Sequence, residues 1–189
     1  MNVQAFIGDW GQLFDNGIKR SAGQMAYAPP GTHLNLGSGR YPLAGDDVIN
    51  LDLPEWRAPF LDFGDGSVAA VHMYHFLEHL DPDTALQQLA EIQRVLRPTG
   101  VCYIAVPHAM CPLAYQAPDH KSFWTEEGLQ DTFYSAGYDT TFGGKPWEMD
   151  ISFMMVAGVK WVNMCVLAQL VKASSDGTRY PSPWRRDND

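Results

Sequence analysis

The sequence predicts a single α/β domain built on a doubly wound, mostly parallel sheet in three layers. Short apolar segments bounded by glycine, proline or aspartate alternate with longer amphipathic segments. The predicted strands are 33–36, 48–51, 68–74 and 101–106, and the predicted helices are 82–97 and 125–136. Such alternation favours βαβ units, and a length of 189 residues suits one domain with a full core. Glycine-rich or acidic residues also follow the first strands directly, where ligands bind in such sheets.

The strands are defined by their apolar content and by the residues that end them. The first strand, His33–Leu36, stops at the turn Gly37–Ser38–Gly39, and the second, Val48–Leu51, stops at Asp52. The two later strands are longer apolar runs, and Pro107 closes the last one. We therefore expect the turn and Asp52 to lie at the carboxyl edge of the sheet.

Both helices carry start and stop signals. Asp81 can cap the first helix, Pro82 suits its first turn, and Pro98–Thr99–Gly100 stops it. Its apolar residues recur at helical spacing and are Ala85, Leu86, Leu89, Ile92, Val95 and Leu96. Thr125 can cap the second helix, which Gly137 ends.

Residues 151–171 form an apolar run long enough to span a bilayer. Lys160 lies near its middle, and Asn163 and Gln169 add to the cost of insertion. The interpretation that avoids this cost is a buried strand followed by a packed C-terminal helix at 161–172. We therefore expect no membrane segment here.

The two ends of the chain differ in pattern from the middle. Residues 1–30 have scattered apolar positions and end in a breaker cluster, which indicates an N-terminal helical arm. Residues 174–189 are polar and contain two prolines, which indicates a flexible tail. The predicted organisation is an arm at 1–30, a domain at 31–173 and a tail at 174–189.

The chain carries 22 acidic and 13 basic side chains, for a formal net charge of −9. An acidic surface repels phosphate backbones, so nucleic acid is disfavoured as a partner, and a cationic ligand fits better. The three cysteines have neither metal-binding nor redox spacing, and we expect no bound metal. The first residues lack the pattern of a secretory signal, so the expected location is the cytoplasm.

Gly37–Ser38–Gly39 allows a tight turn and lets a ligand approach the backbone closely. A dinucleotide-binding turn would place a third glycine at position 42, where this chain has Pro42. The turn therefore favours a nucleoside without a pyrophosphate. Asp52 can accept hydrogen bonds from both ribose hydroxyls, and the alternative is a helix cap or a solvated turn residue.

An ordered set of motifs between about residues 33 and 160 resembles the class I S-adenosylmethionine-dependent methyltransferases, most closely the small bacterial and phage type. The motifs are Leu34–Gly39, Asn50–Asp52, Phe63–Val68, His75–Leu80, Ile92–Gly100 with the strand to Pro107, and Asp119–Thr125 leading to Ala136–Gly137–Tyr138. The resemblance implies a Rossmann-like fold and S-adenosylmethionine as cofactor. The cofactor-binding residues that it implies are Asn35, Gly37, Ser38, Gly39, Asp52, Leu53, Trp56, Tyr74 and His75.

The chain departs from the family pattern at several of these positions. Asn35 stands where the family often has an acid that holds the amino-acid end of the cofactor, and Ala69 replaces another common acid. The acid expected near adenine falls near Glu55 or Trp56, and Asp62 is a rival. These changes bear on cofactor affinity rather than on the fold.

His75 and His108 are the candidate catalytic bases, needed only if the methyl acceptor must lose a proton. His75–Phe76–Leu77–Glu78–His79 also matches the H-x-x-E-H pattern of a zinc protease family. That interpretation needs both histidines on one continuous helix, but a strand precedes His75 and a new helix starts after His79. In the methyltransferase interpretation, Glu78 and His79 support the loop.

The sequence leaves the methyl acceptor unidentified. Only residues 107–124 and the N-terminal arm can cover the site, and this cover does not identify the acceptor. The expected acceptor is a small or glycan-like molecule. The alternative is a catalytically degenerate domain that acts as a binding or structural module, because fold does not establish function. The arm and the 161–172 segment could also form the contact of a homodimer.

Overall fold

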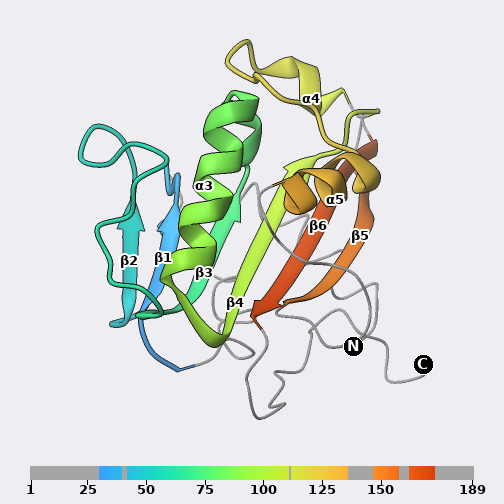
Figure 1. The fold of residues 1–189 in the computed structure, drawn as a ribbon. Helices are drawn as coiled ribbons and strands as arrows, with labels where there is room; N and C mark the ends of the chain where they lie inside the picture. Colours follow the sequence, from blue (N-terminus) through green and yellow to red (C-terminus); the bar gives the residue numbers. More distant parts are fainter. Residues whose placement is uncertain (1–29, 40–41, 111, 136–146, 158–161, 173–189) are drawn as a thin grey trace.

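The computed structural model describes residues 30–39, 42–110, 112–135, 147–157 and 162–172, the last two ranges by their backbone alone. These residues form a six-stranded sheet in the order β2-β1-β3-β4-β6-β5 (Figure 1). The first four strands in that order are β2 (Val48–Leu51), β1 (His33–Leu36), β3 (Val68–Tyr74) and β4 (Leu96–Pro107). They are mutually parallel, which confirms the α/β prediction.

The sheet continues as an antiparallel hairpin of β5 (Trp147–Ala157) and β6 (Val162–Lys172). Strand β6 pairs antiparallel with β4, from Val101↔Val171 to Pro107↔Cys165. The prediction of a strand within 151–171 is confirmed, but the prediction of a C-terminal helix at 161–172 is wrong. A continuous apolar run has no periodicity that distinguishes a buried strand from a buried helix, and here pairing on both edges makes it a strand.

Helices α3 (Pro82–Val95) and α5 (Glu126–Ser135) contact each other and lie over the same face of the sheet (Figure 1). The main core lies beneath them and includes Leu34, Val71, Leu89, Ile104 and Phe133. Both predicted caps are confirmed. The Thr84 amide donates to Asp81 Oδ1 at 3.0 Å, and the Gly128 amide donates to Thr125 Oγ1 at 3.0 Å.

The other face of the sheet carries a buried aromatic cluster. The His72 ring stacks on Tyr103 with centroids 5.2 Å apart and on His33 at 5.4 Å. The hydroxyl of Tyr74 lies 3.0 Å from His72 Nδ1. Helices on this face are not among the described elements, and the predicted arm at 1–30 and tail at 174–189 lie almost entirely outside the described residues.

Arg94 on α3 attaches the segment that links β2 to β3. Its guanidinium donates to the carbonyl oxygens of Leu61 at 2.9 Å and Phe63 at 2.8 Å, and to the carboxylates of Asp65 and Glu91, each at 2.8 Å. These carboxylates raise the pKa of Arg94, and Arg94 in turn lowers the pKa of Glu91. The segment between β2 and β3 is thus held against α3 by Arg94, and it contains no strand.

Two short elements lie at the carboxyl end of the sheet: η1 (Leu77–His79), a single 3₁₀ turn, and α4 (Leu113–Gln116). The sequence analysis predicted neither. In the described part of the chain, no helix has the length and hydropathy needed to cross a bilayer.

Candidate functional site

The glycine turn and Asp52 meet at the carboxyl edge of the sheet, as the sequence predicts. Gly37 and Gly39 have φ values of +66° and +49°, which favour glycine. The Gly37 amide donates to Leu51 O at 2.8 Å, which ties the turn to the end of β2. The Gly39 amide donates to Asp52 Oδ2 at 2.7 Å. This bond engages one carboxylate oxygen, and the half-exposed side chain retains Oδ1 for a ligand.

The two glycines have different surroundings. A Cβ atom on Gly37 would lie 2.3 Å from the ring of Phe76, so this glycine accommodates an aromatic side chain of the protein itself. A Cβ atom on Gly39 would meet nothing closer than 3.9 Å, so the backbone there is open to a ligand. The sequence predicts close ligand approach along the whole turn and does not predict the contact with Phe76, for which the available signal was an aromatic residue two positions after the end of β3.

An aromatic pair forms the wall beside this turn. The rings of Trp56 and Phe76 lie 5.6 Å apart, and Trp56 Nε1 donates to Phe60 O at 2.6 Å. The Trp56 amide donates to Asp52 O at 2.9 Å, so the loop after β2 turns back on itself there. Leu53, in the same loop, is 61% exposed. Leu53 and Trp56, two of the predicted cofactor-binding residues, thus both lie on the loop that begins at Asp52.

Asn35 is buried at the end of β1, and its amide nitrogen donates to Asn50 Oδ1 at 2.8 Å. Asn50 also accepts from the Leu43 amide at 2.8 Å and donates to Leu43 O at 3.0 Å. The Asn35 amide therefore helps to fix the segment before β2. The sequence analysis missed Asn50, which the β1–β2 register places opposite Asn35.

His75 directly follows β3 and adopts φ +53°, a conformation that is rare outside glycine. Its Nδ1 faces Glu78 Oε1 at 3.3 Å, and its amide donates to Ala105 O at 2.9 Å. The side chain is 27% exposed, whereas that of Glu78 is 2% exposed. A buried carboxylate next to Nδ1 favours the tautomer of His75 that carries its proton on Nδ1.

His108 has the opposite arrangement. It is 8% exposed, and its Nδ1 accepts a hydrogen bond from the Met110 amide at 3.1 Å. A neutral imidazole that accepts at Nδ1 carries its proton on Nε2 and has no free lone pair. Nδ1 of His108 is therefore engaged by the loop, and the role of His108 as a base stays a prediction.

Tyr74 lies on the sheet face opposite α3 and packs against the cluster of Ala70, Val101 and Tyr103. Its hydroxyl faces His72, as described above. The structure therefore places the Tyr74 side chain with the aromatic cluster rather than with the glycine turn.

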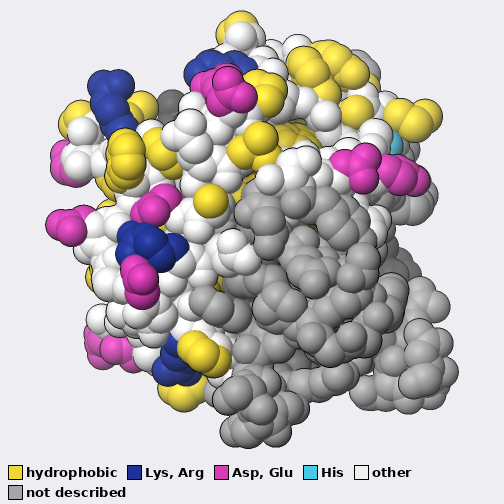
Figure 2. Space-filling model, viewed as in Figure 1, with side chains coloured by type: hydrophobic (Ala, Val, Ile, Leu, Met, Phe, Trp, Pro, Cys, Tyr) yellow, Lys and Arg dark blue, Asp and Glu magenta, His cyan; other side chains and the backbone are white. Residues whose placement is uncertain are grey.

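Residues 108–110 and 112–124 follow β4 and carry exposed apolar side chains, visible at the top of the molecule (Figure 2). Met110 is 80% exposed and Tyr115 is 62% exposed. The rings of Tyr115 and Phe123 stack with centroids 4.8 Å apart, and the Tyr115 hydroxyl donates to Ala109 O at 2.8 Å. This exposed apolar surface lies on the segment that the sequence predicts to cover the site.

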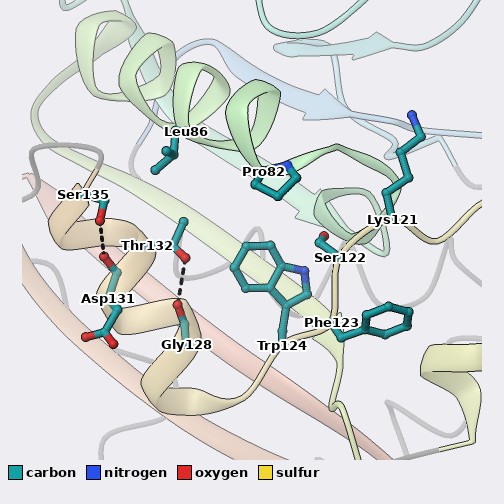
Figure 3. Close-up of a pocket in the computed structure, with 10 residues that line it drawn as sticks. All are labelled: Pro82, Leu86, Lys121, Ser122, Phe123, Trp124, Gly128, Asp131, Thr132 and Ser135. Atoms are coloured by element: carbon teal, nitrogen blue, oxygen red, sulfur yellow. Dashed lines mark hydrogen bonds between the residues drawn. The ribbon is translucent and has the colours of Figure 1, made fainter.

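A separate pocket of about 420 Å³ opens between the start of α3 and α5 (Figure 3). It is lined by Pro82, Leu86, Lys121, Ser122, Phe123, Trp124, Gly128, Asp131, Thr132 and Ser135. None of these belongs to the glycine turn or to the loop after Asp52. The pocket is therefore distinct from the candidate nucleoside site.

The comparisons with known proteins agree with this architecture. Residues 44–104 match the family model described as a methyltransferase domain. No curated protein matches the chain at the level of sequence. Among solved structures, a SAM-dependent methyltransferase from Archaeoglobus fulgidus has a TM-score of 0.59 at 15% identity, with 82% of this chain and 92% of that chain covered.

Two further structures extend the likeness. A SAM-dependent methyltransferase from Thermotoga maritima has a TM-score of 0.57 at 14% identity and covers 89% of this chain and 97% of its own. Phosphoethanolamine N-methyltransferase 2 from Haemonchus contortus, solved with S-adenosyl-L-methionine, has a TM-score of 0.61 at 12% identity, with 89% of this chain and 57% of that chain covered. The family match and the shared fold confirm the resemblance of this chain to the class I S-adenosylmethionine-dependent methyltransferases.

Proposed function

We propose that this chain is an S-adenosylmethionine-dependent methyltransferase that acts on a small or glycan-like acceptor. The observation that carries the proposal is the bond between the Gly39 amide and Asp52 Oδ2 at 2.7 Å, which joins the open glycine turn to a carboxylate at the carboxyl edge. Ligands of doubly wound sheets bind at this edge. The methyltransferase family match covers the Asp52 loop, η1 and most of β4.

Each candidate residue has a role that its position supports. Asp52 accepts hydrogen bonds from the ribose hydroxyls, and the backbone of Gly37–Ser38–Gly39 lies along the cofactor. Leu53 and Trp56 offer apolar surface to the adenine, since both follow Asp52 on the same loop. Asn35 and His75 lie at the ends of β1 and β3 and face the amino-acid part, where Tyr74 contributes backbone rather than its engaged hydroxyl.

When bound, S-adenosylmethionine supplies an electrophilic methyl group on a positively charged sulfur. The protein orients an acceptor lone pair in line with that methyl group and excludes water from it. His75 is the candidate base for the acceptor's proton, and Glu78 acts as a positioning residue through its 3.3 Å contact with His75 Nδ1. The strained backbone of His75 is consistent with a side chain held for function.

The acceptor reaches the site beneath residues 107–124. The exposed ring pair of Tyr115 and Phe123 offers a flat apolar surface suited to a sugar or another ring. The net charge of −9 disfavours nucleic acid as acceptor. A homodimer contact through the predicted arm remains part of the proposal as a second way to cover the site.

Isothermal titration with S-adenosylmethionine and S-adenosylhomocysteine tests the cofactor. The transfer itself is tested with methyl-labelled S-adenosylmethionine and a panel of small alcohols, amines and glycosides. Binding without transfer to any acceptor class would favour the degenerate alternative. No binding of either compound at millimolar concentration would reject the proposal.

A further inference from the structure

The structure brings His120 close to Glu78 and His79, and all three side chains are of types that can bind a metal ion. One donor atom from each of Glu78, His79 and His120 lies within 4.8 Å of the other two. Glu78 and His79 belong to η1, whereas His120 lies on the segment that leads to α5. The H-x-x-E-H pattern pairs His79 with His75 and does not include His120.

Both histidines are already oriented through Nδ1. His79 Nδ1 faces Asp119 Oδ2 at 3.1 Å, and His120 Nδ1 lies 2.8 Å from Ala114 O. Metal-bound histidines characteristically donate their second ring N–H to a carboxylate or a backbone carbonyl. In both rings these contacts leave Nε2 as the nitrogen that can bind an ion.

The Glu78 carboxylate is the third donor, and it is buried. Within the described residues neither of its oxygens accepts a well-formed hydrogen bond, and Oε1 has only the ionic contact with His75. Buried carboxylates are usually paired, hydrogen-bonded or bound to a metal. Because a carboxylate offers two oxygens, contact with His75 through Oε1 leaves Oε2 for an ion.

The two segments that carry the donors are fixed to each other by the backbone. The amides of Lys121 and Ser122 donate to Glu78 O at 2.8 and 3.1 Å. The Ser122 hydroxyl donates to Leu77 O at 3.2 Å. The site therefore needs little reorganisation to bind an ion.

From these contacts we propose that Glu78, His79 and His120 form a site for a divalent transition metal of the zinc type. Two imidazoles and one carboxylate are a donor set that zinc accepts, with a fourth position open to water. Asp119 orients His79 from outside the site. A bound ion would link η1 to the segment before α5, next to His75. This inference does not depend on methyl transfer.

The test is a Zn²⁺ titration of the full chain against a chromophoric chelator, with its cysteine thiols blocked. One Zn²⁺ per chain is expected to bind. Glu78→Gln and His120→Gln should each weaken binding at least ~100-fold, and Asp119→Asn should weaken it by about 10- to 100-fold. His108→Gln is the matched histidine control and should leave the affinity unchanged.

Zn²⁺ should also raise the melting temperature of the wild-type chain but not that of Glu78→Gln. Asp119 is an exposed side chain, so its variant reports on the site even if Glu78→Gln folds poorly. Binding that is absent, or that is unchanged in both Asp119→Asn and His120→Gln, overturns the proposal. Either result leaves cofactor binding at Asp52 as a separate question.

Discussion

A Cβ atom on Gly37 would lie 2.3 Å from the Phe76 ring, so the glycine turn at the end of β1 and the residue after His75 fix each other's position. We expect Gly37→Ala to destabilise the domain and to abolish cofactor binding. The strained φ of +66° costs roughly 1–2 kcal/mol in addition to the clash. Thermal unfolding and cofactor titration measure both effects.

Gly39→Ala is the matched control for Gly37→Ala, because it has a similar φ but open space around the added methyl. Gly39→Ala should lower the free energy of unfolding only by the strain of a positive φ. The double variant Gly37→Ala/Phe76→Ala should recover part of the stability that Gly37→Ala loses. Equal destabilisation by the two glycine substitutions would show that Phe76 is not the cause.

Asp52→Ala should weaken binding of S-adenosylmethionine by about 10- to 1000-fold. Hydrogen bonds to charged groups contribute roughly 1.5–3 kcal/mol, and each ~1.4 kcal/mol is a factor of ten. Asp46→Ala is the control, since Asp46 is an exposed acid before β2 that has no predicted cofactor role. If Asp52→Ala binds the cofactor as well as Asp46→Ala does, the ribose lies elsewhere.

His75→Gln should lower kcat by about 10²- to 10⁴-fold with the best acceptor from the panel, while the Kd of the cofactor changes little. The acid limb of the pH–rate profile should disappear, because the group that must be unprotonated is gone. Glu78→Gln should lower kcat with a smaller effect on KM. An unchanged pH profile in His75→Gln would remove His75 from proton transfer.

Arg94→Met should lower the free energy of unfolding by about 1–3 kcal/mol, because it removes the donors to Leu61, Phe63 and Asp65. The estimate stays below the sum of the bonds because the side chain is 34% exposed and solvent screens its ion pairs. Denaturant unfolding measures the change. Arg57→Met, an exposed arginine on the same linking segment, should have little effect.

We expect the Asp81 cap to account for part of the loss of folding stability at low pH. Hydrogen bonds from the Thr84 amide and hydroxyl lower the pKa of Asp81 below its ordinary value. Its contribution is therefore present above the unfolded pKa and is lost as pH falls through the lower folded value. Asp81→Asn keeps a cap but should reduce the loss of stability as pH falls below the ordinary pKa of an aspartate, measured by urea unfolding at a series of pH values. An identical acid profile in both proteins would show that other carboxylates dominate.

The elements with local signals were predictable from the sequence. The bounds of β1, β2 and β3 follow from apolar runs ended by glycine or acidic residues, and Asp81 and Thr125 start their helices as expected. The meeting of the glycine turn with Asp52 was predictable because parallel strands align their carboxyl ends.

Other features depend on contacts that no local pattern encodes. In the sequence, the residues of β5 and β6 resemble a strand followed by a helix. The pairing of β6 with β4 makes the second segment a strand as well. The packing of Phe76 on Gly37, the Asn35–Asn50 bond and the approach of His120 to His79 join residues distant in sequence. The tautomer of His108 depends on the Met110 amide, which only the folded loop supplies.

The position of β6 has a consequence for any shortened form of the chain. The methyltransferase family match ends at residue 104, and α5 ends at Ser135. A chain cut after α5 would nevertheless leave the long strand β4 with one row of backbone amides and carbonyls unpaired from Val101 to Pro107. Such an open apolar edge recruits strands from other molecules. A chain that ends after α5 should therefore aggregate, because β6 is the strand that covers this edge of β4.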